Sequence, residues 1–208
     1  MKCWKCGGKG SIMVESDNGI GWIPKICPVC HGKMEEKFSN QDILCLVNVQ
    51  NGFLNEFTKP TILELRKFLS DYEFSKVLVV KFINQPNTLF VNELGYEKMM
   101  TPEACETIID IKPFVSVTYL KGTFGFLNQG FLEQIKILNN GELPKHVLLA
   151  GIDLETHILA IAINLFDIGI KPILLADFTT SFEGKEIYHH GLRSFELFFG
   201  RGSILRLG

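Results

Sequence analysis

Beyond position 41 the chain alternates between short apolar runs and longer stretches with apolar residues at helical spacing. Five runs have the length and composition of buried strands: 42–50, 76–82, 115–121, 146–152 and 172–177. Four stretches have the spacing of helices with one apolar face: 61–72, 131–141, 155–168 and 185–200. Apolar strands separated by helices predict an α/β domain with a mostly parallel sheet and helices on both faces, a Rossmann-like three-layer fold.

The first 37 residues lack this pattern and carry two Cys-x-x-Cys pairs, CWKC and CPVC. The pairs are separated by about twenty residues, a spacing typical of structural zinc sites. Their thiols belong to Cys3, Cys6, Cys27 and Cys30. Because so short a segment buries little core, a bound zinc ion is expected to stabilise it. We predict a zinc ribbon over residues 1–37 and the α/β domain over 38–208; the alternative for the thiols is a redox pair or no shared role.

The same segment resembles half of the cysteine-rich region of DnaJ-type co-chaperones, whose repeat is C-x-x-C-x-G-x-G. The first copy, CWKCGGKG, matches in full, whereas the second, CPVCHGKM, ends in Met34. The resemblance implies a metal-binding module that contacts protein or RNA. RNA stays open because lysines interleave here with Trp4 and Trp22, a combination that suits single strands, although Glu35 and Glu36 dilute the charge.

Composition limits the functional classes. Apolar residues make up 46% of the 208 residues and charged residues 21%, which permits a large core and argues against general disorder. The formal net charge of -2 gives no broad basic surface for nucleic acid. No secretory leader or membrane-spanning apolar run is visible, so we expect a cytoplasmic protein with no membrane partner. Cys45 and Cys105, inside apolar segments, are expected to be packing residues.

Three predicted strands are followed by residues that could carry chemistry. Asn48 lies at the end of the first strand, Lys121 at the end of the third, and His157 near the start of the helix after the fourth. In an open parallel sheet, ligands bind beyond the carboxyl ends of the strands. We therefore expect Asn48, Lys121 and His157 to lie close together in a candidate site.

From about residue 42 to 202 the chain resembles the isochorismatase-like cysteine hydrolases, which include nicotinamidases. The family pattern I-D-x-Q-N-D-F is similar to VNVQNGF at 47–53, and its lysine is matched by Lys121. The nucleophile segment G-V-x-T-x-x-C-V is similar to GIDLETHI, and the later D-x-G matches Asp167 and Gly169. The resemblance implies the isochorismatase-like fold for this part of the chain.

Two of the three catalytic positions implied by the resemblance are substituted. The aspartate is Asn48, which cannot accept a proton at a useful pH, and the cysteine nucleophile is His157. The metal motif D-x-H…H of the nicotinamidases is absent from FINQPNTLF at 82–90. The family also has a cis peptide before its nucleophile, which we expect to be retained between Ile152 and Asp153. A neutral His157 is expected, because a helix start and a nearby lysine both disfavour imidazolium.

The sequence thus predicts a divergent protein of this fold that is catalytically inactive and acts in binding or scaffolding, with the zinc module as a second contact surface. One alternative is a hydrolase of a small amide or ester that uses a rearranged Lys121/His157 site. Another is an RNA-associated protein. A homo-oligomer or protein partner is also expected, because Phe198, Phe199 and Ile204 make the chain end apolar. A small-molecule ligand at the three strand-end positions stays open.

Overall fold

The computed structural model describes residues 11–15, 22–26, 38–126 and 128–207. The predicted zinc ligands lie outside the described residues: Cys3, Cys6, Cys27 and Cys30. Between the two cysteine pairs in sequence, β1 (Ser11–Glu15) and β2 (Trp22–Ile26) form an antiparallel pair. Zinc and the boundary between the two predicted domains stay predictions.

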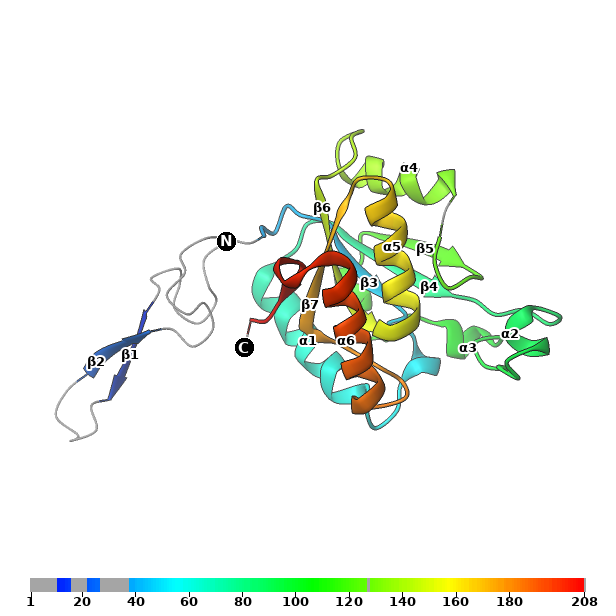
Figure 1. The fold of residues 1–208 in the computed structure, drawn as a ribbon, viewed down its shortest axis with the longest axis horizontal. Helices are drawn as coiled ribbons and strands as arrows, with labels where there is room; N and C mark the ends of the chain where they lie inside the picture. Colours follow the sequence, from blue (N-terminus) through cyan, green and yellow to red (C-terminus); the bar gives the residue numbers. More distant parts are fainter. Residues whose placement is uncertain (1–10, 16–21, 27–37, 127, 208) are drawn as a thin grey trace.

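Six parallel strands form the main sheet (Figure 1). They are β3 (Leu44–Val47), β4 (Val77–Phe82), β5 (Val117–Lys121), β6 (His146–Ile152), β7 (Lys171–Thr180) and β8 (Ile204–Leu205). Their spatial order is β5-β4-β3-β6-β7-β8, and all neighbouring pairs are parallel. The chain builds outward from β3 to β5 and then crosses to β6 on the other side of β3. This reversal is the point where open α/β sheets place their ligand sites.

Helices cover both faces of the sheet. On one face lies α1 (Lys59–Tyr72), which packs against β6 and β7. The other face is covered by α4 (Gln129–Leu138), α5 (Leu159–Asp167) and α6 (Lys185–Phe199). The central strand shows why the sheet is buried on both sides: Leu44 and Leu46 pack in the core beneath α1, while Cys45 and Val47 pack in the opposite core. None of the described helices is long and apolar enough to cross a membrane.

The predicted three-layer α/β fold is confirmed. Each predicted strand and helix has a counterpart, with ends displaced by a few residues. The helix expected at 155–168 begins as a π-helical turn, η3 (Leu154–Ile158), and continues as α5. The turn expected after the helix 131–141 is present, since Asn140 and Gly141 have positive φ angles of 56° and 91°.

Some elements were not predicted. After β4 the chain forms an arm with two four-residue helices, α2 (Leu89–Asn92) and α3 (Pro102–Cys105), visible at the right of Figure 1. Helices of one turn leave almost no periodic signal in a sequence. Strand β8 was also missed, because two residues are too few to show alternation.

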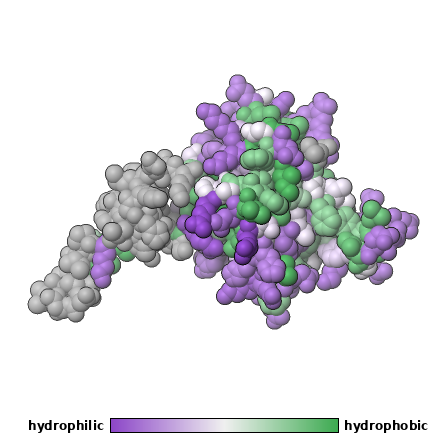
Figure 2. Space-filling model, in the orientation of Figure 1, coloured by the Kyte–Doolittle hydropathy of each residue, from purple (hydrophilic) through white to green (hydrophobic). Residues whose placement is uncertain are grey.

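The C-terminal residues serve the chain's own core more than the sequence suggested. Phe199 and Ile204 pack against the core beneath α5 and α6, whereas Phe198 is half exposed. An apolar area lies over α5 (Figure 2), where Ile163 and Phe166 are 37% and 53% exposed. Phe166 extends this area toward α6 by packing on Phe199, with ring centroids 5.4 Å apart. The expected oligomer stays a prediction.

Candidate functional site

Asn48 follows directly on β3 and is fully buried. Its φ of 54° is left-handed, a conformation that asparagine adopts more readily than most residues. Neither the amide nitrogen nor the amide oxygen has a hydrogen-bond partner among the described residues. A buried amide without partners is unfavourable by about 1–3 kcal/mol, so this side chain is suited to bind a water molecule or a ligand.

Lys121 is the last residue of β5 and is only 6% exposed. Its ammonium donates to the carbonyl oxygens of Thr123 and Phe124, at 2.7 and 2.8 Å. The third contact is with Nδ1 of His157, at 2.6 Å. An ammonium has three N–H donors, so these acceptors use all of them. Burial lowers the pKa of Lys121 to about 7, although Cys45 and Asp153 oppose the shift.

His157 is 5% exposed and lies in the π-helical turn η3. In this turn the amide of Ile158 donates to the carbonyl of Asp153 at 3.0 Å, the five-residue spacing of a π-helix, which often marks a functional site. Burial lowers the pKa of His157 well below its usual range, and Lys121 lowers it further. The ring is therefore neutral at physiological pH, as expected. The main reason is burial and not a helix start, because the helical turn begins three residues earlier, at Leu154.

Phenylalanines surround the histidine. The centroid of the His157 ring lies 5.0 Å from that of Phe82, 5.3 Å from that of Phe124 and 6.3 Å from that of Phe53. Phe124 also packs on Phe90 of the arm after β4, at 4.8 Å, and is itself 42% exposed. The Lys121–His157 pair is thus enclosed in apolar walls, and Phe124 forms the wall nearest to solvent.

Gln50 fixes one of these walls. Its side-chain nitrogen donates to the carbonyls of Phe82 and Cys105, at 2.9 and 3.1 Å. Its side-chain oxygen accepts from the amide of Phe82 at 2.8 Å. Gln50 therefore ties the end of β4, and with it the ring of Phe82, to the loop that carries Asn48.

The site also contains two carboxyl groups that were not predicted from the sequence. Asp153 follows β6 with a left-handed φ of 66°, is 8% exposed, and accepts from the amide of Phe182 at 3.0 Å. Burial raises its pKa to about 7; Glu155 and Glu183 raise the pKa further, and the Phe182 amide and Asn48 oppose the shift. Asn48 therefore lies close enough to Asp153 to lower its pKa, although the contact does not have the usual geometry of a hydrogen bond. An acidic residue directly after a buried strand was the signal that could have found Asp153.

Glu155 completes the acidic side of the site. One of its oxygens accepts from the hydroxyl of Ser181 at 2.8 Å, and the other has no partner among the described residues. Burial raises the pKa of Glu155 as well. The carboxyl ends of the strands therefore carry the amine of Lys121, the imidazole of His157, the carboxyl groups of Asp153 and Glu155, and the unpartnered amide of Asn48.

The expected cis peptide is not present. Every described peptide bond is trans, including Ile152–Asp153, so this expectation was wrong. The turn out of β6 is made instead by positive φ angles at Gly151 (119°) and Asp153 (66°). Glycine is required at 151 for a second reason, since a Cβ atom there would lie 2.2 Å from the carbonyl oxygen of Val47.

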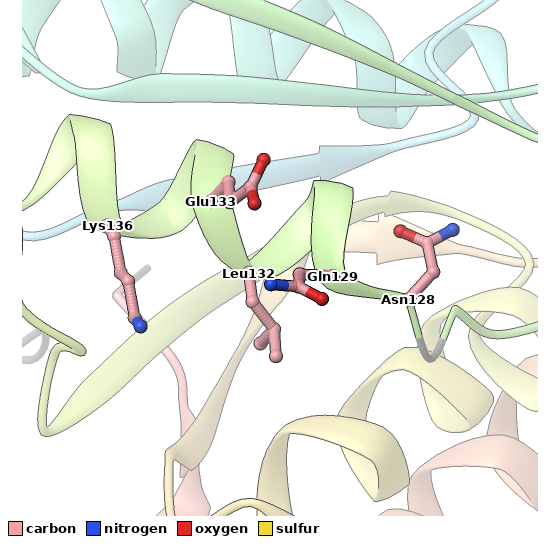
Figure 3. Close-up of a pocket in the computed structure, with 5 residues that line it drawn as sticks. All are labelled: Asn128, Gln129, Leu132, Glu133 and Lys136. Carbon is pink, nitrogen blue, oxygen red and sulfur yellow. The ribbon is translucent and has the colours of Figure 1, made fainter.

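Other parts of the described chain offer weaker candidates. A hollow of about 410 Å³ lies along α4 (Figure 3), but it contains none of the titratable groups of the strand-end site. Its lining residues are Asn128, Gln129, Leu132, Glu133 and Lys136. Within residues 11–15, 22–26, 38–126 and 128–207, no group of three or more His, Cys, Asp or Glu side chains could hold a metal ion. Of the lysines considered for RNA, Lys25 is described, and it is exposed on β2.

No protein-family model matches the sequence, and no curated protein is significantly similar to it. Solved structures do match. An isochorismatase-like hydrolase from Alkaliphilus metalliredigens superposes with a TM-score of 0.68 at 14% identity, covering 80% of this chain and 94% of that one. The fold is that of the isochorismatase-like hydrolases.

Two further neighbours of this fold have different activities. An N-carbamoylsarcosine amidase from Thermoplasma acidophilum has a TM-score of 0.65 at 18% identity, covering 79% of this chain and 94% of that one. A ribonuclease from Caenorhabditis elegans has a TM-score of 0.57 at 14% identity, covering 81% and 77%. The isochorismatase-like fold therefore hosts more than one chemistry, and the function must be argued from the site.

Proposed function

We propose that this chain is a divergent isochorismatase-like protein that has lost hydrolysis and acts as a binding or scaffolding protein. The observation that carries the proposal is the closed Lys121–His157 pair. At the two positions where the family resemblance implies an acid and a thiol nucleophile, the chain has Asn48 and His157. The lysine's three donors are all used within the protein.

Hydrolysis of an amide needs a nucleophile and a group that exchanges its proton. His157 is neutral, and its Nδ1 is occupied by Lys121. Asn48 can donate or accept a hydrogen bond but cannot transfer a proton. Three phenylalanine rings surround His157, so its neighbours other than Lys121 are mostly apolar. These contacts support a binding role over a hydrolytic one.

We propose that residues 1–37 form a structural zinc module that provides a second contact surface. The support is the register of the β1–β2 pair, in which Ser11 lies opposite Ile26. The chain therefore enters and leaves this pair at the same end, and the two cysteine pairs flank that end in sequence. Four thiolates with this spacing are suited to one tetrahedral zinc ion. The partner would be a protein, including a second copy of the chain.

The test of lost hydrolysis is turnover of small amides and esters at pH 7, including a primary carboxamide and an N-carbamoyl compound. The parent protein, His157→Ala and a buffer blank should give the same rate. Sustained turnover by the parent that His157→Ala abolishes would refute the proposal. A variant of an exposed residue, Lys136→Met, controls for unspecific effects of a substitution, because it should leave any genuine rate unchanged.

One observation favours a second function, a hydrolase with a rearranged site. Asp153 supplies a buried carboxyl group whose pKa of about 7 is suited to proton transfer near neutral pH. In that case Asp153→Asn would reduce turnover of the amide panel at least about 100-fold, the usual effect of losing a general acid or base. If the parent has no turnover of the amide panel, the hydrolase function is excluded and Asp153→Asn need not be measured.

A further inference from the structure

Lys121 differs from the other described lysines in its surroundings. It alone among them is buried. Its nitrogen lies 5.5 Å from the centre of the Phe82 ring and 2.6 Å from Nδ1 of His157, with no carboxylate within ion-pair distance among the described residues. A desolvated lysine beside a base, in apolar walls, is the arrangement that makes an amine nucleophilic.

We propose that Lys121 is a nucleophilic amine that binds a small aldehyde or ketone reversibly, as an imine. This activity goes beyond the proposed binding role and does not depend on it. It needs no metal and no redox partner. The expected ligand is small and mostly apolar, because Phe82 and Phe124 form the walls around the amine and the histidine.

The hydrogen bonds allow Lys121 to be an amine as well as an ammonium. In the amine, two N–H groups still donate to the carbonyls of Thr123 and Phe124, and the lone pair accepts from Nδ1–H of His157. The lone pair becomes free when His157 changes to its Nε2–H tautomer. Nδ1 then accepts one amine N–H, and one backbone carbonyl gives up its contact.

The protonation equilibrium supports this chemistry. With a pKa of about 7, roughly half of Lys121 is the free amine at neutral pH. A lysine with the usual pKa of about 10.4 has roughly one free amine in 2,500 at pH 7. The difference is about three orders of magnitude in the concentration of the nucleophile, part of which is offset by the lower basicity of the amine and by its burial.

The reaction can be written with all atoms balanced. Nζ of Lys121 forms a bond to the carbonyl carbon, the carbonyl oxygen takes a proton from the neutral carboxyl of Asp153, and the nitrogen gives a proton to Nδ1 of His157. His157 then returns its proton to the new hydroxyl, which leaves as water while the C=N bond forms. The iminium gives its remaining proton to Asp153. The products are the imine and one water molecule, and both side chains are restored.

Neighbouring groups fit these roles. Asp153 is close enough to Lys121 to raise its pKa slightly. The unpartnered amide of Asn48, at the same edge of the sheet, is available to the oxygen of the carbonyl compound. Phe124 is 42% exposed and separates His157 from solvent, so a ligand is expected to enter where this ring moves aside.

The test is reductive trapping on the full chain. The protein is incubated with acetaldehyde at pH 7, reduced with sodium cyanoborohydride, digested and mapped by mass spectrometry. We expect Lys121 to be alkylated at least tenfold faster than the exposed Lys67 and Lys136, which serve as controls within the same molecule. The rate at Lys121 should fall below about pH 7 and level off above it. Modification of Lys121 no faster than of the two controls would overturn the proposal.

A variant tests where the ligand enters, and the trapping result at Lys121 does not depend on it. Phe124→Ala should speed trapping by a bulkier aldehyde, benzaldehyde, at Lys121 more than at Lys67. Equal acceleration at both lysines would count against entry beside Phe124 and against a built site. Because the adduct is read as mass at one residue, this experiment is independent of turnover: the trapping can succeed or fail whether or not the protein hydrolyses amides.

Discussion

The buried amine of Lys121 predicts an unusual dependence of stability on pH. Its pKa is about 7 in the folded chain and, as for an ordinary lysine, about 10.4 when the chain unfolds. Between these values the unfolded state binds more protons than the folded state. Stability contributed by this group therefore rises with pH across the window from 7 to 10.4. The measurement is the free energy of unfolding at pH 7 and at pH 9.

The size of the effect follows from the two pKa values. At pH 7 the folded lysine is half protonated and the unfolded one almost fully, and by pH 9 the folded lysine is neutral. Integrating the difference in bound protons gives a contribution of about 2 kcal/mol from Lys121 between these two pH values. With a urea m-value of about 2 kcal/mol/M, this raises the unfolding midpoint of the parent by about 1 M relative to a variant without the lysine.

Comparison with Lys121→Met isolates this contribution, because groups that titrate in both proteins cancel in the difference. Urea unfolding is followed by far-UV circular dichroism at pH 7, 8 and 9. The free energy of unfolding of the parent should rise relative to that of Lys121→Met with each step. Lys136→Met, which replaces an exposed lysine of α4, is the matched control and should run parallel to the parent. A constant difference between the parent and Lys121→Met from pH 7 to 9 would refute the buried-amine reasoning.

Three other predictions can be checked with standard methods. Purified protein should contain one zinc ion per chain by elemental analysis, and the double variant Cys3→Ser/Cys27→Ser should lose it without unfolding the main sheet. His157→Cys alone should stay at background in an amide assay, whereas adding Asn48→Asp should give weak turnover, because catalytic groups that act as a unit fail when one is missing. Gly151→Ala should destabilise the chain by about 3 kcal/mol in urea unfolding, from a backbone clash and a strained φ; a change below about 1 kcal/mol would contradict the close packing of β3 and β6.

Sequence patterns were sufficient for the five longer strands of the sheet, though not for β8, and for the residues that differ from the family motifs. Strands such as 44–47 are buried on both faces, so their apolar runs are unambiguous. Asn48, Lys121 and His157 all lie at the carboxyl ends of the strands, but the direct contact is between Lys121 and His157. The sequence places Asp153 directly after a buried strand, but it does not show that this side chain joins the site. Its place depends on a left-handed backbone angle and a π-helical turn, neither of which has a periodic signature.

Burial of the site was equally hard to predict. Lys121 was identified by its position, but its lowered pKa arises from burial among groups of β4, the loop after β5 and η3. The aromatic enclosure joins Phe53, Phe82 and Phe124, which are distant in sequence. Such contacts depend on tertiary packing, for which a single sequence gives no distances.

The strand order also has a consequence for how the chain folds as it is synthesised. The first strand of the sheet, β3, lies at its centre, and its partners on the β6 side are about a hundred residues later in the chain, as the pairing of Leu44 with Leu148 shows. At about 5–20 residues per second, ribosomes need roughly 5–20 s to make that stretch. During this interval β3 and β4 can pair, but the other edge of β3, which later pairs with β6, stays open to other chains. Asp153 and His157 both come after β6, so the site is assembled only once that edge has closed.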